Sequence, residues 1–176
     1  MLLAVKLAIL SEIMLFGALF AAYFVIRAAS GEWPPTNGPE RPELVLPGLN
    51  TTLLVLSSGT MQLGVRAAHL GDRSRILRWL GLTLLLGGIF IVVQGYEFAT
   101  NGFGLGSGIF GSTFYVLTGF HGAHVLVGLA LIGIVANRAR LGLVSAGHDT
   151  AVEASSYYWH FVDVVWLFLF STVYVL

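Results

Sequence analysis

The sequence predicts an all-α integral membrane protein with a bundle of five transmembrane helices. Hydrophobic residues make up 56% of the 176 residues, charged residues make up 10%, and the mean hydropathy is +0.84. A water-soluble domain of this length needs far more charge to cover its surface. A helix spans a bilayer with about 20 mostly apolar residues, and five such stretches occur, at about 4–28, 49–68, 78–98, 109–137 and 153–175. Short connections between them indicate a single transmembrane domain over residues 1–176.

Each stretch is bounded by residues that interrupt an apolar helix. The first is too long for a removed secretory signal and holds Glu12 in its interior, so we interpret it as a retained helix. It ends before a segment rich in Gly and Pro, and a charged segment separates the second from the third. In the third, Gly81, Gly88 and Gly95 recur at intervals of seven, with Gly87 beside them, which predicts close helix packing along that face. Glycine-rich and polar segments bound the fourth and fifth.

The distribution of basic residues predicts the orientation. Arginines crowd the second and fourth connections and Lys6 lies near the start, whereas the first connection is mostly acidic and the third has no charge. Lys and Arg near helix ends collect on the cytoplasmic side of a membrane. We therefore expect a cytoplasmic N-terminus and, after five spans, a C-terminus outside. Arg27, at an outer helix end, is a mild exception.

Charge and cysteine content exclude several classes of function. The net charge is zero, so the chain has no basic field for nucleic acid. It has no cysteine, which excludes disulfides, thiolate metal sites and a Cys nucleophile. Function must therefore come from the other polar groups, several of which lie at membrane depth.

Glu12 lies about two turns into the first predicted helix. A buried charge in lipid costs at least about 2.5 kcal/mol, so such a group normally faces protein and has a partner. A Glu side chain is short for reaching the interface, which favours a buried position. A helix-end acid at the interface is the alternative.

His121 and His124 are spaced i, i+3, so both rings lie on one face of the fourth helix. That spacing is compatible with ligation of a metal or haem. We favour hydrogen bonds to neighbouring helices as the explanation of the pair, because a closed metal site needs further ligands and no cysteine is available. Both interpretations stay open from the sequence alone.

The fifth helix carries His160 and Asp163, about 10 to 15 Å from its cytoplasmic end at a rise of about 1.5 Å per residue. Counting along the other helices places Glu12 and His124 at similar depths. We therefore predict one polar cluster of Glu12, His124, His160 and Asp163, with His121 beside it. It is either a proton path or a structural hydrogen-bond network.

Charged residues near the helix ends are the other candidates. Glu97 closes the third helix and is expected at the outer interface, in contact with a partner subunit or a head group. Arg138 and His148 fall at the cytoplasmic head-group level, where they could pair with lipid phosphates. Generic anchoring of a membrane helix explains the arginine equally well.

Several motifs resemble a known family. They are Ser11-Glu-Ile-Met-Leu-Phe, Gln94-Gly-Tyr-Glu-Phe, the segment from Gly111 to Gly128 with Gly-Phe-His-Gly-Ala-His, and Tyr158-Trp-His-Phe-Val-Asp-Val-Val-Trp-Leu-Phe-Leu. In this order they resemble subunit III of haem-copper cytochrome c oxidases, in its short bacterial form. The resemblance covers essentially the whole chain.

The resemblance implies a non-catalytic subunit of a proton-pumping terminal oxidase in the bacterial inner membrane, which passes electrons from cytochrome c to oxygen. Such a subunit packs beside subunit I, with subunit II and a small subunit IV as further partners. It binds phospholipid and supports proton uptake and durability during turnover. Haems and copper are expected in the partner subunits, and no cofactor in this chain.

By the same resemblance, Glu12 matches a buried, reactive glutamate of the family. His121, His124, His160 and Asp163 match its internal polar positions, and Arg138, His148 and Glu153 match positions around lipid head groups and the subunit I contact. Longer members have two further N-terminal helices, and this chain begins at what resembles their third. The missing pair is either absent or supplied by another subunit.

Other functions remain alternatives. The same motifs occur in the homologous subunits of quinol oxidases and nitric oxide reductase systems. A stand-alone proton or ion carrier would use the buried acids and histidines itself. A haem or metal protein in its own right would retain bound metal without partner subunits.

Overall fold

The computed structural model describes residues 2–31, 33–35, 44–144, 147 and 149–176, and every regular element within them is helical. Five long α-helices follow one another: α1 (Leu2–Ala29), α2 (Val45–His69), α3 (Arg73–Thr100), α4 (Gly108–Arg140) and α5 (Thr150–Phe170). The last continues into a π-helical turn, η1 (Ser171–Val175). The all-α class and the five helices predicted from sequence are confirmed for this part of the chain.

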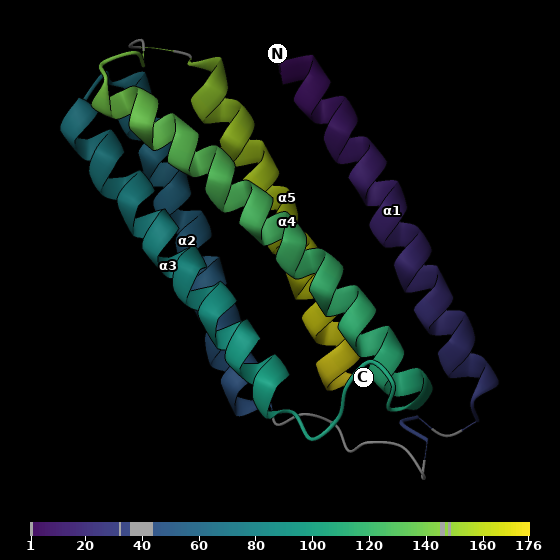
Figure 1. The fold of residues 1–176 in the computed structure, drawn as a ribbon. Helices are drawn as coiled ribbons and strands as arrows, with labels where there is room; N and C mark the ends of the chain where they lie inside the picture. The colour runs from purple at the N-terminus through teal and green to yellow at the C-terminus, as the bar shows by residue number, and fades with distance from the viewer. Residues whose placement is uncertain (1, 32, 36–43, 145–146, 148) are drawn as a thin grey trace.

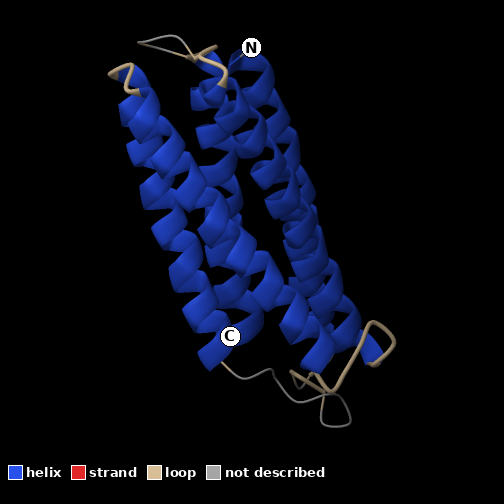
Figure 2. Ribbon diagram, turned by 60° about the vertical axis from the view of Figure 1, so that its left-hand side comes forward, coloured by secondary structure: helices blue, strands red, loops and turns tan. Residues whose placement is uncertain are grey.

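The helices run up and down side by side along one long axis, as both ribbon views show (Figure 1, Figure 2). α2 packs on α3 and α5, and α4 also packs on α3 and α5, so these four helices form a closed four-helix body. α1 lies outside this body and packs on α5 and α4. The two ends of the described chain lie at opposite ends of the bundle (Figure 1).

One end of the bundle gathers the basic residues. There a guanidinium N–H of Arg73 donates to the backbone carbonyl of Arg140, and the Gly147 amide donates to the His69 carbonyl over 3.3 Å. These two bonds join the α2–α3 turn to the α4–α5 connection, at the end where α1 starts (Figure 1). We call this end the basic end; its members are Lys6, Arg66, Arg73, Arg75, Arg78, Arg138 and Arg140.

Aspartates fix where two helices start at the basic end. Asp72 accepts a hydrogen bond from the Arg75 amide over 3.0 Å, and Asp149 accepts from the Ala151 amide over 3.0 Å. Each satisfies a backbone donor that the first turn of a helix leaves open. As a result α3 and α5 begin earlier than their apolar stretches, at Arg73 and Thr150.

Four described segments are long and apolar enough to cross a membrane, namely Leu2–Ala29, Arg73–Thr100, Gly108–Arg140 and Thr150–Val175. The remaining helix, α2, carries many hydroxyl side chains in its middle. Two of them face α5, because Trp166 Nε1 donates to Thr51 Oγ1 over 2.9 Å and Trp159 Nε1 donates to Ser57 Oγ over 3.0 Å. Membrane-spanning capacity is therefore shown for four of the five predicted spans.

The four-helix body closes around Trp159, which is completely buried. A Cβ added to Gly87 of α3 would lie 2.7 Å from the Trp159 ring, and one added to Gly128 of α4 would lie 2.8 Å from it. Real Cβ atoms do not approach other atoms so closely. α3 and α4 therefore reach the indole only because these two positions are glycine.

Among the described residues, the close glycine contact of α3 is at Gly87 and not at the three glycines spaced by seven. A Cβ added to Gly81, Gly88 or Gly95 would meet no described atom within 4 Å, whereas Gly87 is the close contact. Spacing by seven does keep three glycines on one face of a helix. It does not say that this face meets a neighbour.

Candidate functional site

The first polar contact joins α1 to α4. His124 Nε2 lies 2.9 Å from Glu12 Oε2, and His124 Nδ1 lies 2.7 Å from the backbone carbonyl oxygen of Phe120. The side chains are 15% exposed for His124 and 30% for Glu12. An acid in the middle of an apolar helix thus has the partner that the sequence required.

The two bonds of His124 fix how many protons the pair holds. A carbonyl oxygen only accepts, so Nδ1 must carry a hydrogen and donate to Phe120. Nε2 and the Glu12 carboxyl then share one proton, which lies on one or the other. Either way the pair as a whole is neutral, and this suits a site at membrane depth.

The second polar contact joins α2 to α5 through Ser58. Ser58 Oγ lies 2.7 Å from Asp163 Oδ2 and donates to it, and His160 Nδ1 lies 3.2 Å from Ser58 Oγ. With its hydrogen directed at Asp163, the hydroxyl accepts from His160, so the serine connects the two side chains. Sequence reasoning missed Ser58. The Ser57-Ser58 pair in the middle of an apolar stretch was the available signal.

The predicted single cluster is therefore divided in two. In the described residues Glu12 bonds to His124 on the α1–α4 contact, whereas Asp163 bonds to Ser58 on the α2–α5 contact. Phe16 lies edge-on to His124, with ring centroids 4.9 Å apart, and edge-on to Phe161 at 6.2 Å. Aromatic rings thus occupy space next to the Glu12–His124 pair on the side of α5. Similar depth along the helices does not by itself bring side chains on different faces together.

His121 belongs to neither polar contact. It is 1% exposed, and its ring lies 4.9 Å from that of Trp166 and 6.0 Å from that of Phe90, centroid to centroid. In the described part of the chain neither ring nitrogen has a hydrogen-bond partner. Although the two histidines are spaced i, i+3, they have different environments. His121 packs against buried aromatic rings, whereas His124 pairs with the carboxyl group of Glu12.

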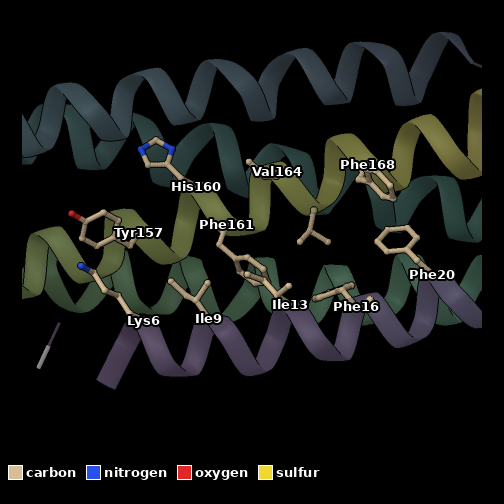
Figure 3. A pocket seen from close by; sticks show the side chains of 12 residues that line it. Lys6, Ile9, Ile13, Phe16, Phe20, Tyr157, His160, Phe161, Val164 and Phe168 are labelled. Atoms are coloured by element: carbon tan, nitrogen blue, oxygen red, sulfur yellow. The ribbon is translucent and has the colours of Figure 1, made fainter. Parts of the chain in front are cut away.

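A long groove separates much of α1 from α5 (Figure 3). It encloses about 690 Å³ and is lined mostly by apolar side chains such as Ile13, Phe20 and Phe168. At its end nearest the start of α1, Lys6 Nζ lies 5.7 Å from the centre of the Tyr157 ring. The groove combines an apolar length with a cation at one end.

At the basic end, Arg138 lines a smaller cavity of about 300 Å³ between α1, α4 and α5. Glu153 lies on α5, with a carboxylate oxygen 3.3 Å from His69 Nε2 of α2. His148, the third residue predicted around head groups, lies outside the described residues.

Comparison with known proteins identifies the family. The family model described as cytochrome c oxidase subunit III matches residues 1–176, which is the whole chain. The chain belongs to the cytochrome c oxidase subunit III family. The probable cytochrome c oxidase subunit 3 of Nocardia farcinica is 45% identical over 168 residues, which cover 93% of this chain and 82% of that protein.

Two further relatives carry the same name. Cytochrome c oxidase subunit 3 of Synechocystis is 44% identical over 173 residues, covering 98% of this chain and 74% of that protein. Its counterpart in Thermostichus vulcanus is 41% identical over 169 residues, covering 96% and 83%. Cytochrome c oxidase is an oxidoreductase complex of aerobic respiration, so membership in this family implies a multi-pass membrane protein with subunit partners such as subunit I.

Glu97 is the acid that sequence reasoning placed wrongly. The sequence predicts it at the outer interface, in contact with a partner subunit or a head group, but it is 4% exposed and accepts a hydrogen bond from Tyr174 Oη over 2.9 Å. Tyr174 belongs to η1, so the contact joins α3 to the last turn of the chain. The physical reason is that α5 extends through η1 alongside the end of α3 and covers the carboxylate.

No three His, Asp or Glu side chains gather to form a metal site in the described part of the chain. The two histidines of α4 cannot form one together, because His121 packs on Trp166 while His124 pairs with Glu12. The prediction that haems and copper belong to other subunits remains a prediction.

Proposed function

We propose that this chain is the non-catalytic third subunit of a proton-pumping haem-copper terminal oxidase that passes electrons from cytochrome c to oxygen. The observation that carries the proposal is the family match over residues 1–176. The side chains at membrane depth support it, because they pair with one another across helices. The haems and copper then belong to subunits I and II, with subunit I as the main contact and a small subunit IV as a further partner.

We propose that all five helices cross the inner membrane of a bacterial cell, with the basic end in the cytoplasm. The support is the collection of basic residues at one end and the hydrogen bonds that direct α2 hydroxyls toward α5. The natural absence of cysteine makes the test simple. In cells that carry Ser74→Cys or Gly102→Cys, an impermeant maleimide added outside should label only Gly102→Cys until the membrane is opened. Labelling of Ser74→Cys alone would contradict this orientation and place the basic end outside the cell.

We propose that the groove between α1 and α5 holds the acyl chain of a phospholipid, with Lys6 near its phosphate. The apolar lining and the cation at one end support this assignment (Figure 3). A lipid in this position would fill the space between α1 and the four-helix body. This gives a physical route by which the subunit sustains the complex, and with it proton uptake, over many turnovers.

The subunit assignment is tested by purification in mild detergent through a tag on this chain, with an optical haem spectrum and mass spectrometry of the accompanying proteins. The expected result is haem absorbance together with subunit I and a copper-binding subunit II. Haem with no copper-binding subunit would point to a quinol oxidase instead. A colourless protein that folds alone would contradict the proposal.

A further inference from the structure

A second cavity opens at the basic end between α2 and α3, on a part of the surface that neither polar contact nor the groove uses. It encloses about 320 Å³. Arg66 of α2 and Arg75 and Arg78 of α3 line it together with apolar side chains, among them Leu63 and Trp79. Three guanidinium groups and an apolar surface thus share one small site.

The charges at this site do not cancel. Asp72 lies 2.9 Å from the Arg75 guanidinium and neutralises it. Among the described residues, Arg78 donates to the neutral Ser74 hydroxyl over 3.4 Å. In the described part of the chain, no carboxylate lies within ion-pair distance of Arg66 or Arg78. The site therefore carries about two positive charges that could bind an anion.

The apolar side chains lie where a lipid tail would run. Leu63 and Arg66 are one turn apart on α2, so they lie on the same face. Leu63 is exposed, and Trp79 is partly exposed about two turns into α3. Tryptophan at this depth is typical of the membrane interface, where a ring meets both head groups and tails.

We propose that this cavity binds an acidic phospholipid, with its phosphate between Arg66 and Arg78 and the start of an acyl chain along Leu63 and Trp79. Guanidinium groups bind phosphate through paired hydrogen bonds, and basic residues at the cytoplasmic face favour anionic lipids. An acidic peptide of a partner would also neutralise the arginines, but it would make no contact with the exposed Leu63. A phospholipid would contact both the arginines and Leu63. The inference needs only that the chain lies in a membrane, so it does not depend on the oxidase assignment.

The test uses the complex purified through this chain and placed in phosphatidylcholine nanodiscs. Each preparation contains a small amount of phosphatidylglycerol or phosphatidylcholine carrying the same photoreactive acyl chain. After illumination, mass spectrometry measures the lipid attached to peptides of the α2–α3 turn. We expect preferential labelling by the phosphatidylglycerol probe. In the variant Arg66→Gln/Arg78→Gln that preference should fall about thirty-fold, because each basic residue near the surface contributes about five-fold.

The matched control is Arg140→Gln, compared with Arg66→Gln and Arg78→Gln as single variants, because it removes one charge from the same end of the bundle but from α4. It should leave labelling of the α2–α3 turn unchanged. In every variant, co-purification of the partner subunits and an unchanged haem spectrum show that the complex is assembled. Equal labelling by the two probes would overturn the proposal. An equal loss in the control variant would overturn it too, because it would assign the preference to net charge rather than to this cavity.

Discussion

α1 is at least as apolar in sequence as any helix of the four-helix body of α2 to α5, yet α1 and the body are held in different ways. In α1 17% of the most apolar stretch is buried, against 44% in α5. The body closes on Trp159 through direct backbone approach at two glycines. α1 instead lies across a groove and is joined to the body by a few polar and aromatic contacts.

The difference shows that two kinds of interaction hold membrane helices together here. Inside a bilayer apolar side chains gain little by leaving lipid, so close packing and hydrogen bonds decide which helices associate. The body combines close packing at two glycines with hydrogen bonds between its helices, whereas α1 is held by a few polar and aromatic contacts. Variants that remove one or the other should therefore act on different parts of the molecule.

The largest effect is expected from filling the glycine contact in the body. Gly87→Val would place methyl groups inside Trp159, and overpacking of this kind costs about 3 kcal/mol. We expect a clearly lower thermal midpoint of the purified complex, or failure to assemble. Gly88→Val is the matched control, because a Cβ there meets no described atom within 4 Å. Equal loss in both variants would contradict the packing account.

A smaller effect is expected from the α2–α5 hydrogen bonds. Asp163→Leu removes the acceptor of the partly buried Ser58 hydroxyl, at a cost of about 2 kcal/mol. Thermal unfolding of the complex measures it. Asp163→Asn keeps an acceptor of similar shape and should lose much less. A result in which both variants match the unchanged protein would rule out this contact as a stabilising one.

A still smaller effect is expected where α1 meets η1. Tyr23 Oη donates to the Thr172 carbonyl over 3.0 Å and accepts from Trp33 Nε1 over 3.1 Å. Tyr23→Phe should cost about 1 kcal/mol and expose α1 to protease before the rest. Tyr96→Phe, at an exposed ring, is the control. Cleavage that begins in α2 to α5 would contradict the view that α1 is the weaker attachment.

The smallest effect on stability is expected from Glu12→Gln. The glutamine amide can donate to His124 Nε2 where the carboxyl stood, so we expect a change within about 0.5 kcal/mol. Infrared difference spectra should lose the signal of the shared proton, while assembly persists. Glu12→Leu cannot replace the bond and serves as the contrast. Assembly lost in Glu12→Gln would mean that the negative charge itself is required.

The sequence was sufficient for the helices because an apolar run of membrane length has few alternatives in its backbone structure. It also identified Glu12, His124, His160 and Asp163 as groups that need partners, since unpaired polar groups are costly in lipid. Depth along a helix follows from counting residues. These predictions depend on one helix at a time, which is why they could be made without coordinates.

The sequence was not sufficient for the pairing between helices. Glu97 is covered by Tyr174, and Ser58 rather than Glu12 is the partner of Asp163, because rotation of each helix about its axis decides which faces meet. Gly87 and Gly88 are neighbours in sequence, but for the same reason only Gly87 lies against the Trp159 ring, and a Cβ added to Gly88 would meet no described atom within 4 Å. A hydrophobic pattern that is apolar on every side carries no information about that rotation.

The central claim is that the Glu12–His124 and Ser58–Asp163 contacts are two independent attachments rather than one cluster. A double-mutant cycle with Glu12→Leu and Ser58→Ala, measured by unfolding of the complex, tests it most directly. We predict additive effects within about 0.5 kcal/mol, as for sites that share no partner. A cycle with Ser58→Ala and Asp163→Leu should show clear coupling. Coupling of about 1 kcal/mol or more between Glu12 and Ser58 would contradict the claim and restore the single cluster.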